Sequence, residues 1–97
     1  MSPLPADSRV VKFIDNDTGY REWLHLHPNG FVINTPRAPS SAYLVLHRAL
    51  CRTIQPQVGK HWTKEYIKVC AEHLHDLEVW ATDEAGGAAH LCPTCFQ

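Results

Sequence analysis

The sequence lacks the features that mark membrane-spanning and exported proteins. No apolar run approaches the roughly 18 residues that a transmembrane helix needs. The first residues, from Met1 to Asp7, contain no basic region followed by an apolar stretch, so no signal peptide is expected. These absences predict a cytoplasmic protein. In that reducing compartment cysteines serve more often as metal ligands, catalytic groups or core residues than as disulfides.

Several catalytic patterns are also missing. The chain has no glycine-rich phosphate-binding loop, no paired-carboxylate site and no Ser/His/Asp spacing. Asp15 and Asp17 lie close together in the sequence, but they are better explained as helix caps than as metal ligands. There is also no internal repeat and no low-complexity segment. The sequence therefore favours a binding protein over an enzyme.

With 97 residues, the chain is long enough for one small domain. A domain of this size buries about 60–65% of the surface of its unfolded chain, so its core is thin and a bound metal would stabilise it usefully. Residues 1–8, which include two prolines, are expected to be a flexible lead-in. Residues 9–97 are expected to form the domain.

Charge is distributed unevenly along a nearly neutral chain. The segment 36–68 carries six cations and one anion, a net of +5, whereas the rest carries three cations and nine anions, a net of −6. A positive field of this kind attracts phosphates or an acidic protein. The alternative is that folding scatters these charges over several solvated faces. The cations of the segment are Arg37, Arg48, Arg52, Lys60, Lys64 and Lys68.

Hydrophobic patterning and turn residues predict an α+β fold. We expect a small, partly antiparallel sheet of about three strands, two helices and a C-terminal cysteine knuckle. Asp15 to Thr18 supply caps for the first helix, and Pro28 ends it. The second helix begins after Thr63, a natural N-cap. The expected strands cover residues 9–14, 31–34 and 43–48, and the expected helices cover residues 19–26 and 64–81.

The four cysteines suggest a structural zinc site. Cys92 and Cys95 have the Cys-x2-Cys spacing that lets two thiolates bind one tetrahedral zinc. Cys51 and Cys70 complete a set of four, and the glycine-rich stretch before the knuckle would let it fold back onto them. Two alternatives stay open. The cysteines can form disulfides, or Cys70 can be a core residue on the apolar face of its helix.

If Cys70 is a core residue, a histidine would complete the ligand set. The histidines in question are His47, His61, His73 and His90. A catalytic thiol at Cys51, activated by His47, is a further alternative. In an extended run these two residues would be separated by about 13 Å, at ~3.3 Å per residue, so the pair would need a turn.

Basic and aromatic residues are mixed in the same segment, which is typical of surfaces that neutralise phosphates and stack bases. Within the predicted strand 43–48, His47 and Arg48 must point to opposite faces, so only one of them can face a partner. Tryptophans in small domains are also common core residues with one wet edge. The candidate ligand-binding residues are His47, Arg48, Arg52, Lys60, His61, Trp62 and Lys64.

Several runs of the sequence resemble a small, poorly characterised bacterial domain that occurs as short stand-alone proteins or attached to larger ones. They are Gly19-Tyr20-x2-Trp23-Leu24-x2-His27-Pro28-x-Gly30-Phe31-Val32-x-Asn34, Leu46-His47-Arg48-Ala49-x-Cys51-x2-Ile54, Trp62-Thr63-x2-Tyr66-x-Lys68-Val69-Cys70-Ala71, Leu77-x2-Trp80-Ala81 and Cys92-x2-Cys95. The resemblance extends from about Phe13 to Cys95. It implies a self-contained fold and no particular activity, ligand or cofactor.

Three hypotheses follow from the sequence. The first is a zinc-stabilised module that binds nucleic acid or another phosphate-bearing partner through residues 48–68. The second is a protein-interaction or regulatory module with an acidic partner. The third is a small enzyme that depends on Cys51 or His47.

Overall fold

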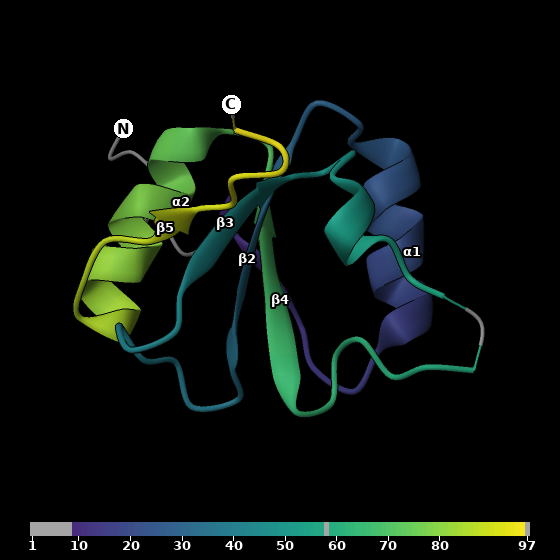
Figure 1. Cartoon of the computed structure of the whole chain (residues 1–97), viewed down its shortest axis with the longest axis horizontal. Helices are drawn as coiled ribbons and strands as arrows, with labels where there is room; N and C mark the ends of the chain where they lie inside the picture. Colours follow the sequence, from purple (N-terminus) through teal and green to yellow (C-terminus); the bar gives the residue numbers. More distant parts are fainter. Residues whose placement is uncertain (1–8, 58, 97) are drawn as a thin grey trace, which may run out of the picture.

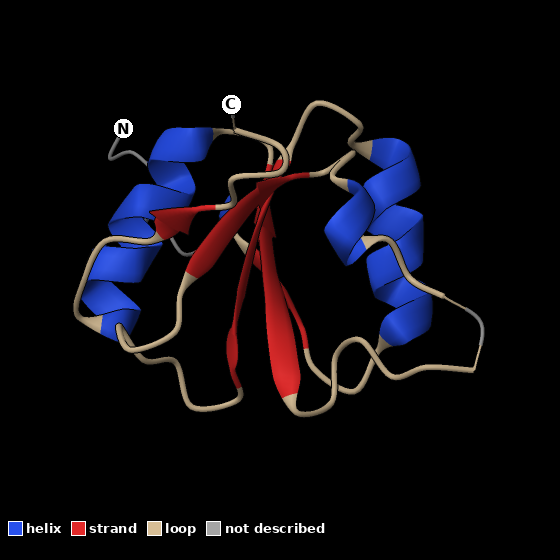
Figure 2. Cartoon of the chain, viewed as in Figure 1, coloured by secondary structure: helices blue, strands red, loops and turns tan. Residues whose placement is uncertain are grey.

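A mixed sheet of five strands lies between two helical layers, as Figure 1 and Figure 2 show. The structure, a computed structural model, describes residues 9–57 and 59–96, so the expected lead-in of residues 1–8 lies outside the described residues. No helix in these two ranges is long and apolar enough to cross a membrane. The elements are β1 (Val11–Phe13), α1 (Asp17–Leu26), β2 (Phe31–Pro36), β3 (Val45–Arg48), a 3₁₀ turn (Arg52–Ile54), β4 (Tyr66–Ala71), α2 (Leu74–Trp80), a π-helical turn (Ala81–Ala85) and β5 (His90–Leu91).

The strand order is β1-β4-β2-β3-β5. All neighbouring strands are antiparallel except β3 and β5, which run parallel. The predicted α+β class with two helices is thus confirmed. The expected number of about three strands was too low, because β4 and β5 were not recognised as strands.

Each face of the sheet carries a hydrophobic core. Val32 and Cys70 point to the face that α1 covers, and the adjacent residues Ile33 and Val69 point to the face that α2 covers. Strands covered on both faces read as continuous apolar runs, because alternate residues enter two different cores. In Figure 1 the two helices lie on opposite sides of the sheet, which is seen nearly edge-on.

The predicted helix over residues 64–81 was wrong in its first half. Residues 66–71 form β4, and the helix begins only at Leu74. The reason is that β4 is buried along nearly its whole length, so its apolar residues do not alternate with polar ones. A short continuous apolar run of this kind cannot be told from a buried helix by its period alone.

The first helix begins at Asp17, two residues before its predicted start, but its cap comes from the segment that the sequence predicts. Asn16 is its N-cap, and its side-chain Oδ1 accepts a hydrogen bond from the backbone N–H of Gly19 at 2.9 Å. Asp17, the first residue of α1, has a different role. Its carboxylate accepts hydrogen bonds from the backbone N–H of Thr63 (2.9 Å), the hydroxyl of Thr63 (2.6 Å) and the backbone N–H of Trp62 (3.2 Å). These bonds attach the segment before β4 to the start of α1.

The hydrogen bonds to Asp17 favour its charged form. Burial by itself raises the pKa of this carboxyl group, but the hydroxyl of Thr63 and the backbone N–H groups of Trp62 and Thr63 lower it by more, so the net shift is downward. A folded-state pKa below the unfolded value stabilises the fold at neutral pH. This contribution is present in full above the unfolded pKa of about 3.9 and is lost as the pH falls through the lower folded value.

We therefore expect Asp17→Asn to lower the free energy of unfolding by about 1–2 kcal/mol at pH 7, because charge-assisted hydrogen bonds become neutral ones. Asp15→Asn is the matched control, since Asp15 forms an exposed ion pair with Arg37 that solvent screens, so its loss should cost clearly less than the loss of Asp17. Urea unfolding at pH 7 and at pH 3 measures both variants. Equal effects of the two substitutions at pH 7 would contradict this account.

Candidate metal centre

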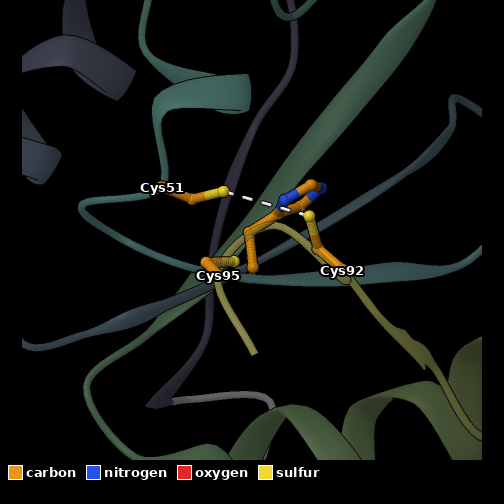
Figure 3. Close-up of side chains that lie close together, drawn as sticks. Cys51, Cys92 and Cys95 are labelled. Carbon is orange, nitrogen blue, oxygen red and sulfur yellow. Dashed lines mark hydrogen bonds between the residues drawn. The ribbon is translucent and has the colours of Figure 1, made fainter. Parts of the chain in front are cut away.

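Four potential metal ligands from three separate parts of the chain converge beside β3. They are His47, Cys51, Cys92 and Cys95, and their ligand atoms all lie within 4.8 Å of one another. The Sγ atoms of Cys51 and Cys92 are 3.9 Å apart. Figure 3 shows the thiols of the three cysteines pointing toward a common centre. A group of three sulfurs and one imidazole nitrogen at this spacing can hold a metal ion.

The pairing of β3 with β5 places two of the four ligands. Leu46 and Leu91 are in register in this parallel pair, and the backbone N–H of Cys92 donates to the carbonyl of Leu46 at 2.9 Å. The residues that follow, His47 and Cys92, are therefore also neighbours. Neighbouring residues in register point to the same face of a sheet, so both side chains face the α1 side.

A tight turn after β3 brings in Cys51. The backbone N–H of Cys51 donates to the carbonyl of Arg48 at 2.9 Å, and Ala49 donates to the carbonyl of Gly30. The turn reverses the chain, so Cys51 comes back over the side chain of His47. It thereby removes the separation of about 13 Å that an extended chain would impose on this pair.

The knuckle at the C-terminus supplies the last ligand. The backbone N–H groups of Thr94 and Cys95 face the thiol of Cys92. Cys95 is held from the other side by Arg48, whose backbone N–H donates to Cys95 Sγ at 3.4 Å and whose Nε donates to the Cys95 carbonyl at 3.0 Å. The guanidinium of Arg48 also lies 4.5 Å from the ring centre of Phe96. Arg48 thus clamps the knuckle onto the end of β3.

Burial and charge shift the pKa of three of the four groups, and the shifts of His47 and Cys92 favour the forms that bind a cation. Burial, followed by the nearby charge of Lys68, lowers the pKa of His47 to about 4, so the imidazole is neutral and its lone pair is available. Burial and the neighbouring thiols raise the pKa of Cys95 to about 12. Burial also disfavours the thiolate of Cys92, yet the N–H groups of Thr94 and Cys95 outweigh it and lower the pKa of Cys92 to about 7. A bound divalent cation would release the remaining thiol protons.

Thr53 lies beside three of the ligands. Its Oγ1 is 3.0 Å from Cys51 Sγ, 3.3 Å from His47 Nδ1 and 3.9 Å from Cys92 Sγ. A hydroxyl group placed in this way can orient both thiolate and imidazole ligands, as the hydrogen-bonding partners of ligands do in other metal sites. No sequence pattern predicts this role, because it depends on the fold that brings Thr53 to the cluster.

Cys70 lies apart from the cluster. It is fully buried in β4, and burial raises the pKa of its thiol. The register explains its position, because Val32 on β2 pairs with Cys70 on one side and with His47 on the other. Cys70 and His47 therefore share a face of the sheet but are separated by a whole strand. The structure brings three of the four expected cysteines together, and His47 is the fourth member of the group. All four cysteines are free thiols.

The other predicted ligand-binding residues divide between two places. Arg48 and Arg52 lie at the candidate metal centre, where Arg52 lines a groove of about 450 Å³ together with Cys51 and Cys95. Lys60, His61, Trp62 and Lys64 precede β4. Phe31 on β2 pairs with Arg48 on one side and with Ala71, the last residue of β4, on the other. The length of β4, about 16 Å at ~3.3 Å per residue, therefore separates Arg48 from the four residues that precede this strand. The basic segment is therefore not one continuous surface.

No family model, curated protein or solved structure matches this chain. The bacterial domain that its sequence resembles stays an expectation.

The ligand set predicts a difference between two cysteine substitutions. Cys51→Ser should weaken cobalt binding and lower the sulfur-to-cobalt charge-transfer absorption that appears when metal-free protein is titrated with Co²⁺, because it removes one of three thiolates. Cys70→Ala is the matched control and should keep both this absorption and a stoichiometry of one metal per chain. Circular dichroism checks that each variant is folded. Loss of the absorption in Cys70→Ala, with Cys51→Ser unchanged, would show that the ligand set is wrong.

Proposed function

We propose that the protein is a zinc-stabilised binding module for nucleic acid or another phosphate-bearing partner. The observation that supports the metal most strongly is the convergence of His47, Cys51, Cys92 and Cys95. Three thiolates and one imidazole form a typical ligand set for zinc in a closed, four-coordinate site. Such a site has no open position for a substrate, so its role would be structural.

A structural role also fits the architecture around the cluster. The metal would link the turn after β3 to the last residues of the chain, which otherwise are attached to the sheet by a strand of only two residues and by the contacts of Arg48 with Cys95 and Phe96. Cys51, Cys92 and His47 are nearly inaccessible to solvent. Ligand bonds in a thin-cored domain contribute directly to folding.

The phosphate-binding part of the proposal rests on the exposed cations of the connection between β3 and β4. Arg52, Lys60 and Lys64 are all exposed. None of these three cations forms an ion pair with a carboxylate in residues 9–57 or 59–96. Arg37, by contrast, is paired with Asp15. Exposed and unpaired cations beside aromatic rings favour a polyanionic partner.

A protein-interaction module is the alternative. Leu50 and Leu91 are large apolar side chains that are 68% and 57% exposed, and Leu50 lines the same groove as Arg52. A partner that combines acidic and apolar residues would match this mixture. A stoichiometric protein complex without any binding of nucleic acid would favour this alternative.

The enzyme hypothesis is less well supported. The turn after β3 does bring His47 near Cys51, as a nucleophile and its base require. However, Cys92 and Cys95 lie within the same 4.8 Å. A Cys/His nucleophile has no need of two further thiols, whereas a metal site does.

The phosphate-binding proposal predicts a steep salt dependence. The zinc-loaded protein should bind a short single-stranded oligonucleotide, and the logarithm of its affinity should fall linearly with the logarithm of salt concentration, with a slope of about −0.7 for each phosphate neutralised. Lys60→Ala should make that slope less steep by about 0.7, the value expected for the loss of one phosphate contact. Lys12→Ala, on the exposed edge strand β1, is the matched control and should leave the slope unchanged.

Fluorescence anisotropy at several salt concentrations measures these slopes. Binding that is independent of salt, or the absence of any binding to DNA and RNA at low salt, would refute the proposal.

A further inference from the structure

A second polar cavity opens beside the start of β4, whereas the candidate metal centre lies level with the end of that strand. Its volume is about 450 Å³, and its walls include Asn34, Trp62, Tyr66 and Lys68. Asn34 and Lys68 are paired residues of β2 and β4, whereas Trp62 belongs to the segment that Asp17 attaches to α1. We call this cavity the Lys68 pocket. Asn34 is not among the residues that the sequence predicts for a site, and Lys68 lies in β4 rather than in the predicted helix over residues 64–81.

The ammonium group of Lys68 is the unusual feature of this pocket. The residue is only 3% exposed. Its Nζ donates to Asn34 Oδ1 at 2.9 Å and to the backbone carbonyl of Trp62 at 2.5 Å. An ammonium group has three N–H donors, and within residues 9–57 and 59–96 no third acceptor is found for it.

No carboxylate in the described ranges forms an ion pair with Lys68. Asp17 acts on it only from a distance, because its oxygens are taken up by Trp62 and Thr63. The rings of Tyr20 and Trp62 stand 6.0 and 5.8 Å from Nζ and stabilise the charge in part. Burial lowers the pKa of Lys68 to about 8, so the cation is still the main form at neutral pH. A buried cation without a counter-ion favours an anion as the ligand.

Trp62 supplies a second donor without a partner. Its indole Nε1 is buried and has no hydrogen-bond acceptor among the described residues. Leaving a buried donor unpaired costs about 1–3 kcal/mol, which a ligand with acceptor oxygens near it would recover.

The rim of the pocket adds charge and aromatic surface. Lys64 and His61 are exposed there, against the single acid Glu65. Tyr66 is 43% exposed. Aromatic side chains beside cations can bind a nucleotide, because the base stacks on a ring and the phosphate accepts hydrogen bonds from the cations.

We propose that the Lys68 pocket binds one nucleotide, with its phosphate at Lys68 and Lys64 and its base against Trp62 and Tyr66. The proposal rests on the proposed function and makes it more specific, because it assigns recognition to one pocket rather than to the basic surface as a whole. The nucleotide can be free or can be one unit of a strand.

The test follows the indole N–H resonances of the three tryptophans in ¹⁵N-labelled protein during titration with AMP. The Trp62 resonance should move, while those of Trp23 and Trp80, which lie in the two cores, should not. Adenosine, which lacks only the phosphate, should bind at least about tenfold more weakly, as expected if one charge-assisted hydrogen bond is lost. An unmoved Trp62 resonance, or equal affinity for AMP and adenosine, would overturn the proposal.

Two substitutions locate the phosphate. Lys68→Met should abolish AMP binding, and Lys64→Ala, at an exposed position that the fold tolerates, should weaken it severalfold even if Lys68→Met fails to fold. Lys12→Ala is the matched control and should leave AMP affinity unchanged. Equal affinities of the Lys64→Ala and Lys12→Ala variants would overturn the proposal.

An oligonucleotide arm separates this inference from the proposed function. If the oligonucleotide binds with a steep salt dependence and AMP does not bind, the pocket proposal fails and the proposed function stands. If AMP binds with the expected dependence on Lys64 and the oligonucleotide binds no more tightly than AMP, the pocket is supported and its ligand is a free nucleotide. If neither binds, both are refuted.

Discussion

The candidate metal centre depends on the pairing of two residues of β5 with β3. The backbone hydrogen bonds that attach this segment to the sheet include those from the His90 N–H to the Leu44 carbonyl and from the Cys92 N–H to the Leu46 carbonyl. So short a pairing provides little free energy against the entropy of fixing the last residues of the chain. Its register nevertheless places Cys92 beside His47, and a metal bound there would hold the segment far more firmly than its hydrogen bonds do. The strand positions the ligands, and the bound ion would in turn hold the strand.

Much of the fold could be predicted from local chemistry. The cap at Asn16, the stop at Pro28 and the β-forming runs before and after α1 depend on neighbours in the sequence, so their patterns predict α1, β1 and β2 closely. The Cys92-x2-Cys95 spacing is local in the same way, and both residues belong to the cluster. The opposite orientations of His47 and Arg48 follow from strand alternation alone: His47 is buried and Arg48 is exposed.

Features that depend on distant pairing could not be predicted in this way. β4 lies in the middle of the sheet with a core on each face, so its apolar residues show no alternation, and Tyr66 to Cys70 resemble the start of a helix. The choice of His47 over Cys70 depends on strand order, since β2 separates β4 from β3. One signal was present: the spacing His47-x3-Cys51 is short enough for two ligands of one ion once a turn follows the strand. Lys68 lies between the β-branched residues Ile67 and Val69, and this position in an apolar run was a similar sign that the cation is buried.

The two ends of the sheet thus have separate chemistries, a sulfur-rich cluster at one end and a cationic pocket at the other. The central claim concerns the first, namely that one zinc ion is held by His47, Cys51, Cys92 and Cys95. X-ray absorption at the zinc edge tests it most directly, on protein purified without added metal. The account predicts one zinc per chain, with three sulfur neighbours at about 2.3 Å and one nitrogen neighbour at about 2.0 Å. Four sulfur neighbours, or a protein without zinc, would contradict it.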